Sequence, residues 1–211
     1  MRLLTEVERF QRWADAYPVD QRSGEWETFY EDWNDLYDAV FDYVTNHPFI
    51  VWSVQNINLI LYAIARDNAL GYIAREILDR FPELILPLTR AAIASGEPDA
   101  RWQLAMMLSL LSQETLEPRH LLLILVQDNN EYVRRKSLYC LAHLRAPEVE
   151  DLALEAWNRP DPAQEYARMM ALSCLQQVHS LKLDTLLVEA ERDERQYLQQ
   201  YAQRMRKKMS I

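Results

Sequence analysis

The sequence has 211 residues, of which 49% are hydrophobic and 26% are charged, and its formal net charge is -9. This apolar content is sufficient to bury a core, which excludes wholesale disorder. Only three residues are glycine, whereas an average usage of about 7% would give roughly fifteen. Because hairpin turns and phosphate-binding loops need glycine for positive φ, the composition argues against a hairpin-rich fold and a nucleotide-binding loop.

The sequence gives no sign of export or of a membrane span. Its longest apolar runs, residues 59–65 and 121–126, are far shorter than the ~20 residues that a spanning helix needs. The first ten residues include Glu6, Glu8 and Arg9, where a signal peptide has an apolar core. Two cysteines without a disulfide framework fit a reducing compartment. We therefore expect a cytoplasmic protein with no membrane partner.

The charge is unevenly distributed along the chain. Residues 1–96 contain eight Lys or Arg and fifteen Asp or Glu, whereas residues 97–211 contain fifteen and seventeen. Within the first part, residues 23–46 contain seven carboxylates and no Lys or Arg. Nucleic-acid binding needs a basic surface, so no nucleic-acid partner is expected. The acidic region favours a basic protein as its partner.

Apolar residues recur at helical spacing along most of the chain. Before residue 96, helices are expected over residues 3–17, 25–45, 50–65, 69–81 and 83–94. The apolar faces of the first two are Leu3, Val7, Phe10, Trp13 and Tyr17, then Trp26, Tyr30, Trp33, Tyr37, Val40 and Val44. Several prolines stand where a helix should begin, namely Pro48, Pro82, Pro98, Pro118, Pro147 and Pro162. Pro87 lies inside an expected helix and should kink it.

From Gly96 onward the sequence repeats itself. Three tripeptides align and are each followed by a leucine in register, namely Asp99-Ala100-Arg101 with Leu108, Tyr132-Val133-Arg134 with Leu141, and Tyr166-Ala167-Arg168 with Leu175. The leucines are 33 and 34 residues apart, and Tyr197-Leu198-Gln199 continues the series. Further helical segments precede these, over residues 83–94, 118–127, 148–157 and 181–189. Two antiparallel helices per unit of roughly 30–40 residues predict an α-solenoid.

These segments resemble the HEAT-repeat family, whose second helix typically begins with an acidic residue, a small aliphatic residue and an arginine. The best matches are residues 128–138, which include Tyr132-Val133-Arg134, and residues 162–172, from Pro162-Ala163 to Leu172. The last unit has Gln199 where arginine is expected, which suits a capping repeat. The resemblance implies an all-α fold, an α-solenoid of HEAT-like helix pairs. We expect residues 1–46 to form an N-terminal helical cap and residues 47–211 to form the repeats.

The expected second helix carries five carboxylates at spacings of three and four residues, Glu27, Glu31, Asp35, Asp38 and Asp42. They would form one stripe opposite the aromatic face, where like charges one turn apart cost about 0.2–0.5 kcal/mol per pair. No Lys or Arg within that helix offsets them. The stripe is interpreted either as a solvated outer face or as a docking strip for a basic partner. A metal site is disfavoured, because a straight stripe cannot surround one ion.

A second candidate surface lies on the second helices of the repeats. Tyr132, Tyr166 and Tyr197 occupy one aligned position, and the next turns add Lys136 with Tyr139, Met170 with Ser173, and Tyr201 with Arg204. Tyrosine offers a large contact area at a small cost in rotamer entropy. The rings would either seal the seams between units or line a concave binding surface. A base-stacking platform is disfavoured by the overall charge.

The sequence offers little for catalysis. Cys140 and Cys174 occupy equivalent positions and are expected to be small core residues, because packed helices stand too far apart for a disulfide. No nucleophile elbow, phosphate-binding loop or paired-histidine zinc helix is present. We therefore expect no enzyme activity, no catalytic residue, no cofactor and no metal.

Three functional hypotheses follow from the resemblance, because similar arrays serve as adaptors, as immunity proteins against bacterial toxins and as one class of DNA-repair glycosylase. The acidic stripe favours an inhibitor or immunity-type protein that neutralises a basic protein such as a nuclease toxin, and this is the function that we prefer from the sequence. The tyrosine row favours an adaptor or assembly factor that binds a protein through the repeats alone. A HEAT-like nucleic-acid enzyme would need a strongly basic groove and is the least favoured.

Overall fold

The computed structural model describes residues 1–95, 97–111, 115–160 and 164–209, and of Gln164 it describes the backbone. Every regular element in these ranges is a helix, which confirms the all-α class. None of the helices in these ranges is long and apolar enough to span a bilayer. Gly96, Pro162 and Ala163, which helped to define the repeats, lie outside the described residues.

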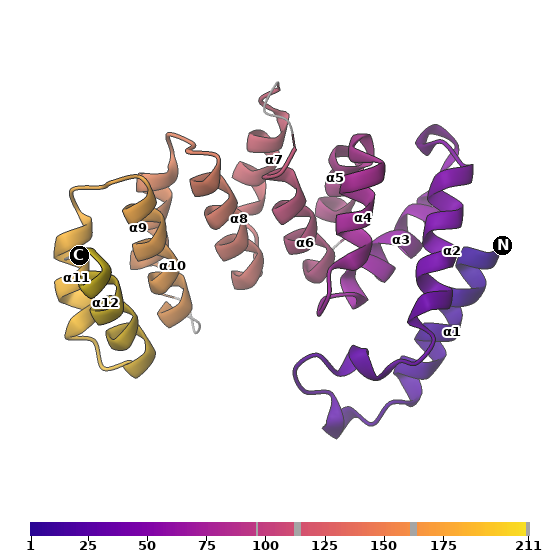
Figure 1. Cartoon of the computed structure of the whole chain (residues 1–211), viewed down its shortest axis with the longest axis horizontal. Coiled ribbons are helices and arrows are strands. Elements are labelled where there is room, and N and C mark those ends of the chain that lie inside the picture. The colour runs from indigo at the N-terminus through magenta and orange to yellow at the C-terminus, as the bar shows by residue number, and fades with distance from the viewer. Residues whose placement is uncertain (96, 112–114, 161–163, 210–211) are drawn as a thin grey trace. The chain divides into compact units, whose positions relative to one another are not determined.

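The chain divides into two compact units, residues 1–113 and 114–211. Consecutive helices of the second unit pack in pairs, which is the α-solenoid plan expected from the repeats (Figure 1). In the first unit α1 packs on α2 and α5 packs on α6, whereas α3 packs mainly on α6. The division expected between residues 46 and 47 falls inside the first unit and stays a prediction. The elements of the first unit, with η for a 3-10 helix, are α1 (Arg2–Ala16), η1 (Val19–Gln21), η2 (Trp26–Phe29), α2 (Trp33–Asn46), η3 (Phe49–Val51), α3 (Val54–Arg66), α4 (Tyr72–Arg80), η4 (Pro82–Leu84), α5 (Ile85–Ser95) and α6 (Pro98–Leu108).

The long helix expected over residues 25–45 is wrong, because the chain breaks it after η2. Tyr30 ends η2 in an extended conformation, and α2 begins only at Trp33. The break lets the rings of Tyr30 and Trp33 pack on Phe10 of α1, at centroid distances of 4.8 and 5.2 Å. The Trp33 indole also donates a hydrogen bond to the Glu27 carbonyl at 3.0 Å, across the break. Aromatic packing against α1 therefore outweighs local helical periodicity.

Two other helices of the first unit begin later than expected. Residues 49–51 form η3, and α3 starts at Val54 because the Ser53 hydroxyl caps it by accepting a hydrogen bond from the Asn56 amide at 3.2 Å. The segment expected as one helix over residues 83–94 divides into η4 and α5. Pro87 then lies in the first turn of α5, where amide groups have no intrahelical partner, so its missing amide costs no helical hydrogen bond. The expected kink stays a prediction.

The turn between α3 and α4 is organised by Asp67, which is 2% exposed. Its carboxylate accepts hydrogen bonds from the Ile73 amide at 2.8 Å and from the Tyr37 hydroxyl of α2 at 3.1 Å. Burial raises the pKa of the Asp67 carboxyl and also raises the pKa of the Tyr37 phenol. Gly71 closes the turn with a φ of 61°, a conformation that glycine adopts without strain. Asp67 thus ties α2 to the start of α4.

The second unit consists of three helix pairs. Its elements are α7 (Glu117–Leu125), α8 (Glu131–His143), α9 (Val149–Asn158), α10 (Gln164–Gln177), α11 (Leu183–Glu191) and α12 (Gln196–Met209). We call α7, α9 and α11 the first helices and α8, α10 and α12 the second helices. Each first helix packs on the second helix that follows it, and α10 also packs on both α8 and α12 (Figure 1). The second helices therefore form one continuous layer.

Two equivalent turns reverse the chain within this unit, after α8 and after α10. Arg145 and His179 adopt left-handed φ values of 54° and 55°. After α8, the amides of Arg145 and Ala146 donate to the Ala142 and Leu141 carbonyls, and the same pattern recurs at His179. These bonds form the Schellman motif that closes helix ends, usually with glycine at the left-handed position. The repeat thus keeps its turn geometry without its usual residue.

Candidate functional site

The layer of second helices presents a row of tyrosines at its exposed side. Tyr132, Tyr166 and Tyr197 hold equivalent positions on α8, α10 and α12 and are 37%, 47% and 62% exposed. Part of each ring is therefore open to solvent. The neighbouring turns place the other predicted residues on the same side of these helices, and none of them is buried. We call this set the tyrosine face: Tyr132, Lys136, Tyr139, Tyr166, Met170, Tyr197 and Tyr201.

Arg135 joins two rings of the tyrosine face. Its guanidinium lies 4.8 Å from the Tyr132 ring centroid and 5.3 Å from that of Tyr166, so it contacts rings of adjacent repeats. Its charge is balanced on the same helix, because Glu131 accepts hydrogen bonds from it at 2.8 and 3.3 Å. The Lys136 ammonium lies 5.1 Å from the Tyr132 ring centroid. The rings are thus held in place by cations while part of their surface stays open.

Two hollows border the tyrosine face. One lies among α8, α9 and α10, and its lining combines apolar side chains such as Leu138, Leu152 and Met170 with charged ones, namely Glu131, Arg134, Arg135, Glu155 and Arg159. The other lies between α10 and α12. It is lined by Gln176, Tyr201, Arg204, Met205 and Lys208. The face therefore combines exposed rings with a small recess of mixed lining at α10 and a cationic recess at α12.

The arginines of the aligned tripeptides have a structural role that the sequence did not reveal. Arg134 donates to the Asp128 and Asn129 carbonyls at 2.8 and 2.9 Å and so fixes the loop before its own helix. Arg168 donates to the Trp157 carbonyl at 3.0 Å and to the Asp193 carboxylate at 2.9 Å. These bonds hold α10 to the preceding helix and to the turn before α12. Arg168 thus links its helix pair to the next one, whereas Arg134 fixes a loop within its own pair.

Residues 118–205 match the family model for HEAT repeats. Residues 118–205 belong to the HEAT-repeat family. The match covers α7 to α11 and most of α12, and so it includes the whole tyrosine face. No curated protein and no solved structure matches the chain. HEAT repeats commonly mediate protein–protein interactions, and they generally act as non-enzymatic scaffolds.

Within the HEAT repeats, both cysteines are buried and unbridged, as expected for core residues. The Cys174 thiol lies 3.9 Å from the Leu138 carbonyl. Burial raises the pKa of Cys174 to about 12, so this thiol is not ionised at neutral pH. No group of side chains suited to hold a metal ion occurs among the described residues.

The acidic stripe expected before the repeats does not exist as one line on one helix. Glu27 lies in η2, outside α2, and is 4% exposed. The other predicted residues are exposed, but α1 supplies cations to three of them. Arg2 pairs with Asp42 at 2.6 Å and with Asp38 at 3.6 Å, and Arg9 pairs with Asp35 at 3.0 Å. Arg9 also pairs with Asp32 at 2.6 Å.

Only Glu31 of the predicted stripe is both exposed and without an ion pair among the described residues. Sequence reasoning looked for compensating cations within the same helix, where none occur. The cations instead come from α1, which packs on α2. The expected surface of uncompensated acids is therefore wrong, and the partner role assigned to these residues stays a prediction.

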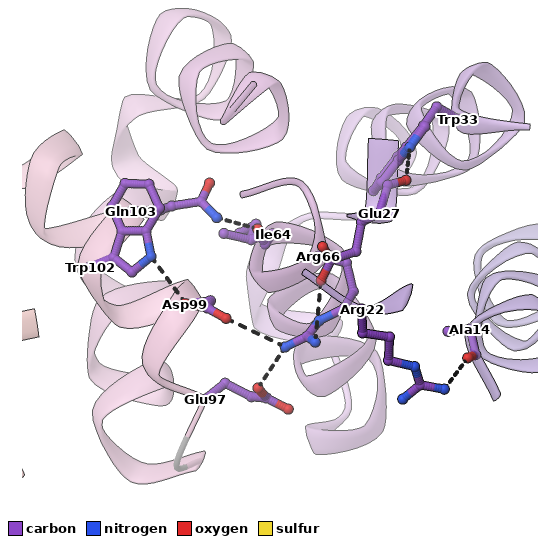
Figure 2. Close-up of polar contacts among 10 residues, drawn as sticks. All are labelled: Ala14, Arg22, Glu27, Trp33, Ile64, Arg66, Glu97, Asp99, Trp102 and Gln103. Atoms are coloured by element: carbon purple, nitrogen blue, oxygen red, sulfur yellow. Dashed lines mark hydrogen bonds and ion pairs between the residues drawn. The ribbon is translucent and has the colours of Figure 1, made fainter. Parts of the chain in front are cut away.

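Glu27 belongs instead to a partly buried polar cluster of the first unit, in which Glu27 itself is buried (Figure 2). Arg66 of α3 lies between three carboxylates, at 3.8 Å from Glu27, 3.4 Å from Glu97 and 3.8 Å from Asp99. Burial raises the pKa of the Glu27 carboxyl, although the nearby Arg66 charge opposes this effect. The cluster joins η2, α3 and the start of α6. It is a structural element of the first unit, and no side-chain pattern near Glu27 indicated it.

Proposed function

We propose that the chain is a non-enzymatic, protein-binding adaptor and that the tyrosine face is its binding surface. The observation that carries the proposal is the exposure of Tyr132, Tyr166 and Tyr197, which hold the same position on the second helices of three consecutive repeats. Exposed tyrosines that are already held by neighbouring contacts lose little conformational entropy on binding.

A finer role as inhibitor of a basic protein, such as a nuclease toxin, receives less support. It is favoured by the net charge of residues 1–113, which contain nine Lys or Arg and seventeen Asp or Glu. However, the carboxylates of α2 that motivated it are mostly paired with Arg2 and Arg9. The tyrosine face needs no contribution from that region, and so the adaptor is the function we prefer.

The adaptor proposal is tested by affinity capture with the full chain from extracts of the source cells. The test variant combines Tyr132→Ala, Tyr166→Ala and Tyr197→Ala. The matched control combines Ile124→Ala, Leu181→Ala and Val188→Ala, which truncate exposed apolar side chains outside the tyrosine face. Circular dichroism and thermal unfolding establish that both variants fold.

The expected result is a protein captured by the wild type and the control and lost from the tyrosine variant. Capture that persists in the folded tyrosine variant would overturn the proposal, whether or not the control retains it. Capture that requires residues of α2, with no effect of the tyrosines, would favour the inhibitor instead.

A further inference from the structure

Positive and negative side chains separate between the two helix types of the HEAT repeats. The second helices carry Arg134, Arg135, Lys136, Arg168, Arg204, Arg206, Lys207 and Lys208 against only Glu131 and Glu165. The first helices carry Arg119 alone against Glu117, Glu150, Asp151, Glu155, Asp184, Glu189 and Glu191. The second unit as a whole has almost no net charge, so the composition of the chain does not reveal this separation of charge.

The two acids of the second helices are already engaged. Glu131 binds Arg135 on the same helix. The Glu165 carboxylate accepts a hydrogen bond from the Leu198 amide at 3.0 Å, at the start of α12. Neither carboxylate is left to balance the cations of α12. The positive potential of the layer is therefore strongest along α12.

The cations of α12 differ in how they are paired. Arg206 binds Glu191 of the preceding helix at 2.7 Å. For Arg204, Lys207 and Lys208, no carboxylate partner occurs among the described residues, and all three side chains are exposed. Arg204 and Lys208 line the recess that also contains Tyr201. This recess thus offers cationic donors beside an aromatic ring.

From this arrangement we infer that the tyrosine face binds an acidic segment of a partner protein, with its carboxylates at Arg204 and Lys208. The inference rests on the proposed function, since it names the chemistry of the partner for the same face. Complementary charge accelerates and orients such an encounter. The exposed rings would contact apolar side chains between the acids. The partner expected is therefore acidic, opposite in charge to the one expected from the sequence.

A nucleic acid is a poorer match than an acidic polypeptide. Its backbone needs a cation at each of several successive phosphates. The central second helix, α10, carries one cation, Arg168, and that side chain is bound by Asp193 and by the Trp157 carbonyl. The chain's net charge of -9 adds a long-range repulsion, although Glu150, Glu155 and Glu191 of the first helices are ion-paired, with Lys182, Arg159 and Arg206. An acidic segment with apolar residues between its carboxylates does not need a cation at each successive residue.

The experiment uses the full chain and fluorescent peptides built from Glu-Glu-Leu, Lys-Lys-Leu or Ser-Ser-Leu triplets, with single-stranded oligo-dT as a further probe. Binding is measured by anisotropy at low salt and at ~0.15 M salt. The test variant combines Arg204→Glu and Lys208→Glu. The control combines Arg12→Glu and Arg192→Glu, which changes the net charge equally at exposed positions outside the tyrosine face.

The Glu-Glu-Leu peptide is expected to bind the wild type and the control, and to bind the test variant at least about tenfold more weakly. Equal binding of the Ser-Ser-Leu or Lys-Lys-Leu peptide would overturn the inference, as would equal weakening in the control. Tighter binding of oligo-dT through the same residues would assign the face to nucleic acid. Self-association that is lost in the test variant would assign it to a second copy of the chain, and both outcomes would overturn the inference.

The two proposals can fail separately. Suppose that the Glu-Glu-Leu peptide does not bind, and that the charge reversal leaves capture of the cellular partner unchanged while the tyrosine variant abolishes it. The acidic-partner inference is then wrong and the adaptor proposal stands. If the tyrosine variant also captures the partner normally, the adaptor proposal is wrong as well.

Discussion

Arg168 of α10 and Asp193, in the turn before α12, are joined at 2.9 Å. Asp193 also accepts hydrogen bonds from the Arg195 amide at 2.9 Å and from its Nε at 2.6 Å. One carboxylate therefore closes the turn between the last two helices and fastens it to the helix of the preceding repeat. The tyrosine face depends on this junction, because it fixes α12 beside α10.

Replacing Asp193 by Asn should destabilise the protein. It should also make the unfolding free energy depend less on pH in the acid range. The hydrogen bonds with Arg195, assisted by Arg168, lower the pKa of Asp193 to about 2. An unfolded aspartate has a pKa of about 3.9. The stabilisation from Asp193 is therefore present above about pH 4 and lost as the pH falls toward 2.

The expected loss of unfolding free energy at neutral pH is about 2 kcal/mol for Asp193→Asn. Urea unfolding followed by circular dichroism at pH values from 7 down to the acid limit would measure both effects. Glu194→Gln at the exposed neighbouring position is the control and should change stability little. An Asn variant as stable as the wild type at neutral pH would contradict the role of the junction.

The pH dependence of the unfolding free energy should change in the opposite direction for Glu27→Gln. Burial raises the pKa of Glu27 in the folded state, so the folded protein holds this proton more tightly than the unfolded chain does. The wild type therefore loses stability as the pH rises through the raised pKa. The Gln variant does not lose stability in this way, and Arg66 keeps its ion pairs with Glu97 and Asp99.

The measurement for Glu27 is the difference in unfolding free energy between the Gln variant and the wild type. It should shift in favour of the variant between about pH 4 and 7. Glu25→Gln, at an exposed position of the same segment, should show no such trend. A variant that instead loses stability relative to the wild type as the pH rises would refute the assignment.

Glycine at the left-handed turn positions should stabilise the second unit. Arg145 and His179 pay a conformational cost at φ values of 54° and 55° that glycine avoids. Because glycine also adds entropy to the unfolded chain, the net gain expected for Arg145→Gly is about 0.5–1 kcal/mol. Arg145→Ala removes the same side chain and keeps the strain, so thermal unfolding of the two variants separates the causes. Equal stability of Ala and Gly variants would exclude strain at this turn.

Removing the cations of α1 should uncover the acids of α2. With Arg2→Gln and Arg9→Gln, Asp35, Asp38 and Asp42 lose their ion-pair partners. Binding of the Lys-Lys-Leu peptide should then become several-fold tighter at low salt, because the carboxylates are no longer neutralised. Arg12→Gln, on an exposed part of the same helix, tests whether net charge alone has this effect. Unchanged peptide binding would show that these acids do not form a docking surface.

The repeat architecture could be predicted because it is encoded at fixed spacing. Leu108, Leu141 and Leu175 are all fully buried, as their alignment implied. The exposed side of the second helices could be predicted in the same way, since Tyr132 and Tyr166 lie one repeat apart on equivalent turns. Periodicity within and between helices depends on local geometry, which a sequence displays directly.

The state of the predicted acidic surface could not be predicted, because contacts between distant segments decide which of its carboxylates are ion-paired or buried. Glu27 meets Arg66 from a helix almost forty residues later, and Asp42 meets Arg2 from the preceding helix. The break before Trp33 likewise follows from aromatic packing on Phe10, which no local propensity encodes. The separation of charge between first and second helices was visible in the sequence, but only a count by helix rather than by chain half reveals it.

Because the first and second helices carry opposite charge, the second unit has a permanent dipole moment directed across its two helix layers. An approaching anionic body would exert a torque on this dipole and turn the layer that bears Tyr166 toward itself before contact. The effect acts over about one Debye length, roughly 8 Å at 0.15 M salt, and lengthens as salt is diluted. A unit of nearly zero net charge can thereby show salt-sensitive association rates that its isoelectric point would not suggest.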